Sequence, residues 1–241
     1  MTVPISGYLR LVLAPLLITI LFASPSLQAA PDIAAEIRYQ SQAITPDGIT
    51  KSSRHIDHFI RAGEQVWLER QIPAAVRQHP HDHHEDHPGQ GHHRLDVHDV
   101  DLDAAAKYIT RLPDGKADLT FVNRPRKLTV HIESENYQTV GFNGDWNTAY
   151  NLIDPAHVKK MRPLLHRPAP AGRRWYTESD ERSYLNILWD QAKGFPLQIE
   201  SGQRDGSLKR TVTIHYRPLP KTLPWTQLRD YSAKDYNDLL D

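Results

Sequence analysis

The chain has 241 residues, and its 29 basic and 29 acidic side chains give a formal net charge of zero. This balance supplies no electrostatic attraction for nucleic acid or for an anionic membrane surface, so neither is expected as a partner. The sequence contains no cysteine, which excludes disulfides, a thiol nucleophile and a lipid-modified N-terminal cysteine.

Residues 1–30 have the layout of a secretory signal peptide. Arg10 precedes the apolar run LVLAPLLITILF, and small residues follow it up to Ala29 and Ala30, after one of which cleavage is expected. A retained membrane anchor is the alternative, but the run is shorter than the roughly 20 residues that span a bilayer and contains Pro15. An exported chain without cysteine is consistent with a periplasmic location.

Apolar and polar residues alternate with a period of two after the signal peptide, which predicts half-buried strands. The expected strands are AEIRYQSQA, SSRHIDHFI and EQVWLERQI, with turns at TPDG and at AG between them. In the first strand, Ile37 and Tyr39 share a face opposite Glu36 and Arg38. Because turn residues separate alternating runs, the three segments are expected to pair as antiparallel neighbours.

Residues 77–101, RQHPHDHHEDHPGQGHHRLDVHDVD, interrupt this pattern, because they hold eight of the fourteen histidines and few aliphatic side chains. Such a segment cannot bury an apolar face, so it is expected to be a flexible, disordered insertion. Imidazole is a common ligand for Zn(II), Cu(II) and Ni(II), which makes divalent-metal binding the first interpretation. The predicted metal ligands are His79, His81, His83, His84, His87, His92, His93 and His98.

This histidine pattern does not match a catalytic zinc motif. The stretch HHEDH is one residue shorter than His-Glu-x-x-His, and no helix is expected there. Binding is expected to be weak or spread over several sites, since a flexible segment loses conformational entropy when it wraps an ion. A solvated low-complexity insertion with no metal role is the alternative.

Further strands are expected after the insertion: AAAKYITRL (a strand or a short helix), KADLTFVN, RKLTVHIES, RRWYTES, SYLNILWD, FPLQIES and LKRTVTIHY. One helical region is expected in DWNTAYNLIDPAHVKKMRPLL, with Asp154 as its N-cap and Pro155 as the first helical residue. The tail DYSAKDYNDLLD is expected to contain a short helix. Residues 31–241 are therefore predicted to form a single antiparallel β-rich domain.

Several short patterns in the C-terminal half resemble one family. The segment NILWDQAKGFPLQIESGQRDGSLKRTVTIHY contains Trp189-Asp190 at a strand end, Gly194 in a turn, Pro196-Leu197 opening a strand and Asp205-Gly206 in a hairpin. With AGEQVWLER and NLIDPAHVKK, it resembles the periplasmic half-barrels of the lipoprotein-carrier type and the related N-terminal domain of envelope-stress regulators. The resemblance touches about half of the chain, and residues 77–101 have no counterpart in it.

The resemblance implies a mainly β (α+β) fold, a curved antiparallel sheet or half-barrel with one or two covering helices around an apolar cavity. It also implies a non-catalytic carrier or binding protein for an apolar lipid or lipoprotein ligand. The expected lining residues, for which ordinary core is the alternative role, are Trp67, Leu128, Val130, Ile132, Leu185, Ile187, Trp189, Leu197, Ile199, Val212 and Ile214.

Little in the sequence predicts catalysis. There is no Gly-x-Ser-x-Gly motif, so the chain is not expected to be an enzyme. His55 and Asp57 share one face of a predicted strand, with His58 on the other; the pair suits an oriented histidine or a plain surface position. Two further functions stay open. One is a periplasmic Zn, Cu or Ni buffer or chaperone, and the other an envelope-stress sensor or regulatory module acting through a periplasmic or membrane protein.

Overall fold

The structure, a computed structural model, describes residues 30–72 and 105–239. Residues 1–29 of the predicted signal peptide and all eight histidines of residues 77–101 therefore lie outside the described residues. In the two described ranges, no helix has both the length and the apolar character needed to cross a bilayer.

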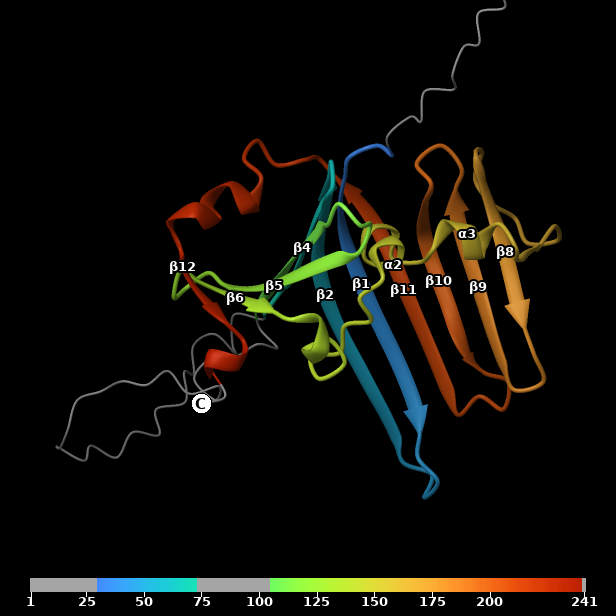
Figure 1. The fold of residues 1–241 in the computed structure, drawn as a ribbon. Coiled ribbons are helices and arrows are strands. Elements are labelled where there is room, and N and C mark those ends of the chain that lie inside the picture. The colour runs from blue at the N-terminus through green and yellow to red at the C-terminus, as the bar shows by residue number, and fades with distance from the viewer. Residues whose placement is uncertain (1–29, 73–104, 240–241) are drawn as a thin grey trace, which may run out of the picture.

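The strands of the described residues form one open sheet in the order β12-β6-β5-β4-β3-β2-β1-β11-β10-β9-β8-β7. All neighbours are antiparallel except β12 and β6, which run parallel. The bounds are β1 (Ile33–Ile44), β2 (Thr50–Ala62), β3 (Gln65–Arg70), β4 (Ala106–Arg111), β5 (Ala117–Asn123), β6 (Leu128–Ile132), β7 (Arg162–Pro163), β8 (Arg173–Ser179), β9 (Ser183–Asp190), β10 (Phe195–Gln203), β11 (Leu208–Arg217) and β12 (Ser232–Asp235). Figure 1 shows that the sheet curves, and β1 joins its two halves by pairing with β2 and β11.

The long β1–β2 hairpin follows from alternation and from its turn. Ile33, Ala35 and Ile37 are buried on one face of β1, as the period of two requires. The turn ends at Gly48, whose φ of +81° is a left-handed conformation that glycine adopts without strain. Sequence and backbone therefore agree on where this hairpin reverses.

The helical segments are short and lie over the sheet. They are η2 (Ser134–Asn136), α2 (Trp146–Asn151), α3 (Pro155–Val158), η3 (Pro224–Asp230) and η4 (Asn237–Leu239). Asp145 caps α2 by accepting a hydrogen bond from the Asn147 amide at 3.0 Å, and Asp154 caps α3 in the same way. Figure 1 shows α2 and α3 in front of the concave face of the sheet.

The helical region expected after residue 145 forms two short helices, in line with the one or two covering helices expected. Leu152 has a φ of +63°, a left-handed conformation that ends α2. A second helix then starts with the predicted Asp154 cap and Pro155 at its first turn. The chain beyond it is extended, because Arg162 and Pro163 pair with β8 as β7.

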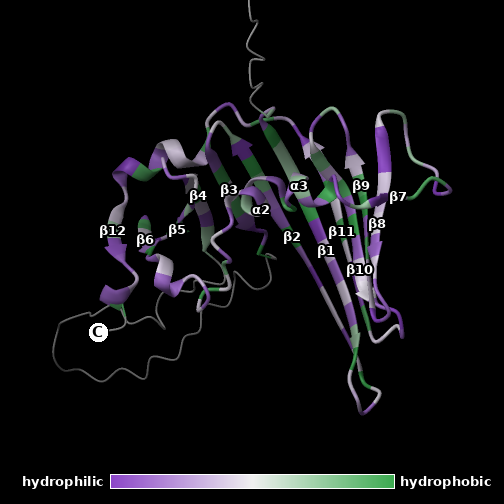
Figure 2. Cartoon of the chain, turned by 45° about the vertical axis from the view of Figure 1, so that its right-hand side comes forward, coloured by the Kyte–Doolittle hydropathy of each residue, from purple (hydrophilic) through white to green (hydrophobic). Residues whose placement is uncertain are grey.

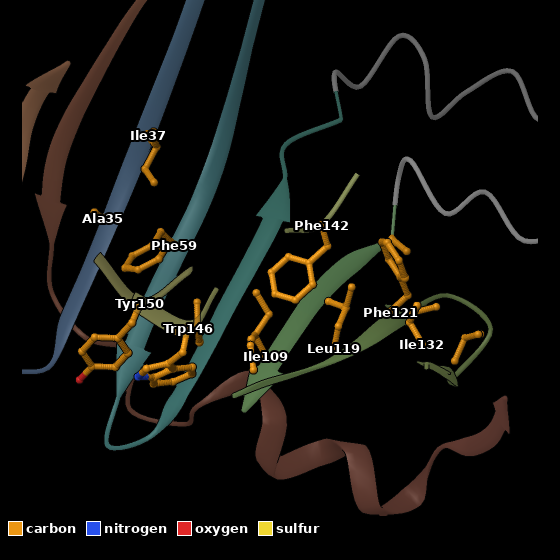
Figure 3. Close-up of a cluster of buried hydrophobic side chains, with 14 of the residues drawn as sticks. Ala35, Ile37, Phe59, Ile109, Leu119, Phe121, Ile132, Phe142, Trp146 and Tyr150 are labelled. Atoms are coloured by element: carbon orange, nitrogen blue, oxygen red, sulfur yellow. The ribbon is translucent and has the colours of Figure 1, made fainter. Parts of the chain in front are cut away.

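The main apolar core lies on the concave face, between the sheet and the chain that crosses it. Figure 2 shows apolar residues along the inner strands, and Figure 3 shows side chains of this core from several strands and from α2. A smaller cluster lies on the convex face under η3, around Trp67, Ala106 and Val122. The predicted mainly β fold, with a curved sheet and short covering helices, is confirmed.

Candidate functional site

Helix α2 covers the centre of the concave face with two aromatic side chains. Trp146 and Tyr150 are four residues apart, so both project from one side of the helix, and their ring centroids are 5.0 Å apart. They pack in the same buried cluster as Ile37 and Phe59 (Figure 3). Burying apolar side chains of this size contributes roughly 1.5–3 kcal/mol each. The helix is therefore fixed to the sheet mainly by its aromatic face.

Arg61 on β2 lies beneath the end of α2 and is fully buried. Its guanidinium lies over two rings, with its central carbon 4.6 Å from the Tyr150 centroid and 4.8 Å from that of Phe195. Its hydrogen-bond acceptors are all neutral oxygen atoms: the carbonyls of Pro31 (3.3 Å), Tyr150 (3.2 Å) and Lys193 (3.1 Å), and Oδ1 of Asn151. Burial lowers the pKa of Arg61 from its ordinary value, but an arginine stays protonated in proteins. One cation thus ties β2 to the N-terminal segment, to α2 and to the β9–β10 turn.

Helix α3 covers a second part of the concave face. Val158 and Met161 pack on Ile187 and Trp189 of β9, and His157 of α3 bonds the carboxylate of Glu178 on β8 at 2.7 Å. This contact fills the region where the predicted lining residues of β9 lie. The opposite part of the concave face, over β2 to β5, is not covered by α3.

A cavity of about 430 Å³ lies over that part of the sheet. This volume is within the roughly 300–1,000 Å³ typical of small-ligand sites. The lining residues come from β2 to β5, from the crossing segment after η2 and from the chain after β12: Asp57, Leu68, Arg70, Ala105, Lys107, Phe121, Thr139, Val140, Gly141 and Tyr236. Leu68, Phe121 and Val140 also belong to or pack on the main core, so the cavity has an apolar wall continuous with it.

Charged side chains line the same cavity. Asp57 and Arg70 are direct cross-strand partners on β2 and β3, and Nε of Arg70 donates to Oδ1 of Asp57 at 3.1 Å. The Asp57 side chain is 6% exposed and that of Arg70 is 44% exposed. Nζ of Lys107 lies 5.6 Å from the centroid of the Phe121 ring. The cavity therefore combines an apolar wall with a buried carboxylate and two cations.

Next to this ion pair, Tyr39 and His55 stack across β1 and β2. Their ring centroids are 4.5 Å apart with an interplanar angle of 18°, because the two residues are direct cross-strand partners. Partial burial, and then the nearby Arg70 cation, lower the pKa of His55, and burial raises that of Tyr39. His55 shares the concave face with Asp57, but the hydrogen bonds of the described residues include none between them.

A second cavity, of about 500 Å³, lies at the turns that join β8 to β9 and β10 to β11. Its lining is hydroxyl, amide and charged: Thr177, Ser179, Tyr184, Gln203, Arg204, Asp205, Gly206 and Lys209. None of these lining residues is Ala, Val, Leu or Ile.

The structure places the eleven predicted lining residues in several positions, none of them in the wall of the 430 Å³ cavity. Five belong to or pack on the main core: Leu128, Val130, Ile132, Val212 and Ile214. Four lie in or against the cluster under α3: Leu185, Ile187, Trp189 and Ile199. Leu197 falls at the irregular pairing between Pro196 and Gln198 and belongs to none of the clusters of the described residues.

Trp67 is on the wrong face for the predicted lining. Its cross-strand partners are Ile60 and Tyr108, and it is buried on the convex side with Leu228 of η3 nearby. Both faces of β3 are apolar, since Val66 and Trp67 are each buried. The alternation in this strand therefore does not distinguish the concave from the convex face.

Sequence reasoning missed the side chains that define the site, above all Arg61, Arg70 and Phe121. A signal was present in β2, where the residues facing inward are His55, Asp57, Phe59 and Arg61. Charged residues in the inward phase of a strand point to a buried ion pair or to a polar site.

The predicted metal ligands have no counterpart cluster among the described residues. Among residues 30–72 and 105–239, no group of three or more His, Asp or Glu side chains is placed to hold an ion. The predicted ligands between His79 and His98 lie outside those ranges, so the metal interpretation stays a prediction.

No family model matches the chain, and no curated protein sequence is recognisably similar to it. Its structure is similar to that of an uncharacterized conserved protein from Thermus thermophilus, at 10% identity and a TM-score of 0.38, covering 83% of this chain and 90% of that one. It is also similar to a DUF1329 family protein from Desulfovibrio piger, at 9% identity and a TM-score of 0.37, covering 81% and 89%.

A third similar structure is a putative outer membrane lipoprotein-sorting protein domain from Vibrio parahaemolyticus, at 8% identity and a TM-score of 0.33, covering 81% of this chain and 88% of that one. The fold is established by the sheet itself.

Proposed function

We propose that this protein is an exported, non-catalytic carrier that holds an acyl-chain ligand on the concave face of its sheet. The observation that carries the proposal is the 430 Å³ cavity, whose wall of Leu68, Phe121 and Val140 continues the main core. Each methylene group that leaves water for such a wall contributes about 0.8 kcal/mol. The predicted signal peptide supports export, and a periplasmic location is part of the same proposal.

The covering segments supply the second support. Helix α2 and the chain before it cross an otherwise open sheet and bury aromatic rings against it. A cavity that lies under a crossing segment, rather than inside a closed core, can admit a ligand by a small displacement of that segment. No nucleophile–base pair is needed for this role.

Native mass spectrometry of the untagged mature protein tests the proposal. The expected result is co-purified or added lipid bound to the natural chain, with at least about tenfold weaker binding to Thr139→Trp, whose side chain enters the cavity. Thr139 is exposed on the crossing segment, so the fold should tolerate the change. Thr222→Trp is the matched control, because Thr222 is also exposed and is not among the lining residues. Equal lipid binding by both variants, or none by the natural chain, refutes the carrier.

A second proposal concerns the histidines at positions 79–98, whose density in the sequence supports binding of Zn(II), Cu(II) or Ni(II). A variant without residues 77–98 is expected to lose metal uptake and to keep lipid binding. Metal titration of both forms by the same method checks this. Tight metal binding that vanishes with the segment, together with no lipid on either form, would favour the metal buffer or chaperone over the carrier.

A further inference from the structure

Arg70 is a side chain at the cavity that has hydrogen-bond donors to offer a ligand. Its only hydrogen bond or ion pair among the described residues runs from Nε to Asp57. The N–H groups of the two terminal guanidinium nitrogens therefore remain able to donate hydrogen bonds to a ligand. The side chain that carries them is 44% exposed. By contrast, the Asp57 carboxylate that holds it is almost fully buried. The guanidinium is anchored on one side and open on the other.

The charges around the cavity favour an anion. Arg70 and Lys107 are cationic and Asp57 is anionic, so the lining carries a formal charge of +1. The pKa of His55 is lowered first by its own burial and second by the Arg70 cation. The second effect is consistent with a positive potential beside Arg70. The apolar side chains Leu68, Phe121 and Val140 line the same space. A charged end and an apolar wall in one cavity match an amphiphile rather than a hydrocarbon.

We infer that the ligand of this cavity is an anionic amphiphile whose carboxylate or phosphate binds the free edge of the Arg70 guanidinium. The inference rests on the proposed carrier function and names the head group that the site selects. A planar guanidinium forms paired hydrogen bonds with two oxygens of a carboxylate or phosphate. The half-exposed position of Arg70 keeps the head group at the mouth, while the alkyl chain lies against Phe121 and Val140. Asp57 acts as a positioning residue that fixes the guanidinium.

Three ligands with one chain and different head groups test the inference: dodecanoate, dodecyl phosphate and dodecanol. Each displaces the uncharged fluorescent probe N-phenyl-1-naphthylamine from the full mature protein at pH 7. At least one of the two anions is expected to bind about tenfold more tightly than dodecanol, a difference typical of charge-assisted hydrogen bonds. The stronger of the two anions distinguishes a fatty-acid ligand from a phosphate-bearing lipid.

The variant Arg70→Gln is expected to lose the preference for the anion and to keep dodecanol binding. Because it leaves Asp57 buried without its partner, the double variant Asp57→Asn/Arg70→Gln serves as a second test without an unpaired carboxylate. Arg54→Gln is the matched control, since Arg54 is exposed on β2 and is not among the lining residues.

Two results overturn the inference while the carrier stands: equal binding of all three ligands by the natural chain, or an anion preference that survives in both Arg70 variants. If none of the three ligands displaces the probe and none binds in native mass spectrometry, the carrier proposal and the inference are both overturned. Retained dodecanol binding in the variants shows that their cavity is intact.

Discussion

Arg61 and Arg70 project from the same face of neighbouring strands, but their surroundings differ in kind. Arg61 is fully buried, and neutral oxygens from three separate segments accept its hydrogen bonds. Arg70 is half-exposed and bonds a single carboxylate. The Arg61 guanidinium forms four hydrogen bonds with protein oxygens, whereas that of Arg70 forms one and lies beside a cavity.

The comparison separates a closed region of the concave face from an open one. Around Arg61, hydrogen bonds from the guanidinium hold α2 and the β9–β10 turn against β2. Removal of the cation would leave several carbonyl groups buried without hydrogen-bond donors. Around Arg70, the apolar wall and the free donors lie next to the cavity. Stability is therefore expected to depend on the first region and ligand preference on the second.

The largest expected effect follows from Arg61→Met, which keeps the length of the side chain and removes all its donors. The free energy of unfolding should fall by at least about 3 kcal/mol, because hydrogen bonds to a charged group are lost and buried acceptors become unpaired. Urea denaturation of Arg61→Met and Arg70→Met compares their losses in the free energy of unfolding. Arg54→Met is the control at an exposed position. If Arg70→Met costs as much stability as Arg61→Met, the division into two regions is wrong.

A smaller effect is expected for the ion pair at the cavity. In a double-mutant cycle with Asp57→Asn and Arg70→Gln, the coupling energy should be about 1 kcal/mol, since solvent screens the half-exposed Arg70. Denaturation of the four proteins gives this number. A coupling near zero would mean that Asp57 does not hold the guanidinium, and the positioning role assigned to it would fail.

Much of this fold can be predicted from the sequence, because alternation reports local burial. In β11, Val212, Ile214 and Tyr216 alternate with Thr211 and Thr213, and the register confirms that the first three face the same side. The break of the helical region at Leu152 could not be predicted in the same way, since a left-handed leucine has no sequence signature.

The site could not be predicted, for a related reason. Alternation tells which residues share a face, but only contacts between distant segments decide which face a crossing chain covers. Arg61 bonds residues 89 to 132 positions further along the chain, and the cavity wall combines β3 with a segment some seventy residues later. Nothing in the local pattern of β2 or β3 specifies these partners.

The smallest expected effect is a pH dependence confined to the edge of the sheet formed by β5, β6 and β12. His131 on β6 contacts Asp118 at 2.9 Å and Asp235 of β12 at 3.5 Å, and Tyr236, the next residue, lines the cavity. Partial burial lowers the pKa of His131, but these carboxylates outweigh it, so the pKa lies above its ordinary value of 6.5. A raised pKa stabilises the fold fully below pH 6.5, and this contribution is lost as pH rises through the folded pKa.

Hydrogen exchange measured from pH 5 to pH 8, with rates corrected for the intrinsic effect of pH, tests this dependence. Protection of β12 should weaken relative to α2 as pH rises, by less than about 1 kcal/mol because His131 is partly exposed. The difference should disappear in His131→Gln and persist in His215→Gln, a substitution at an exposed histidine of β11. Equal loss of protection in α2 would show that the closed and open regions respond as one unit.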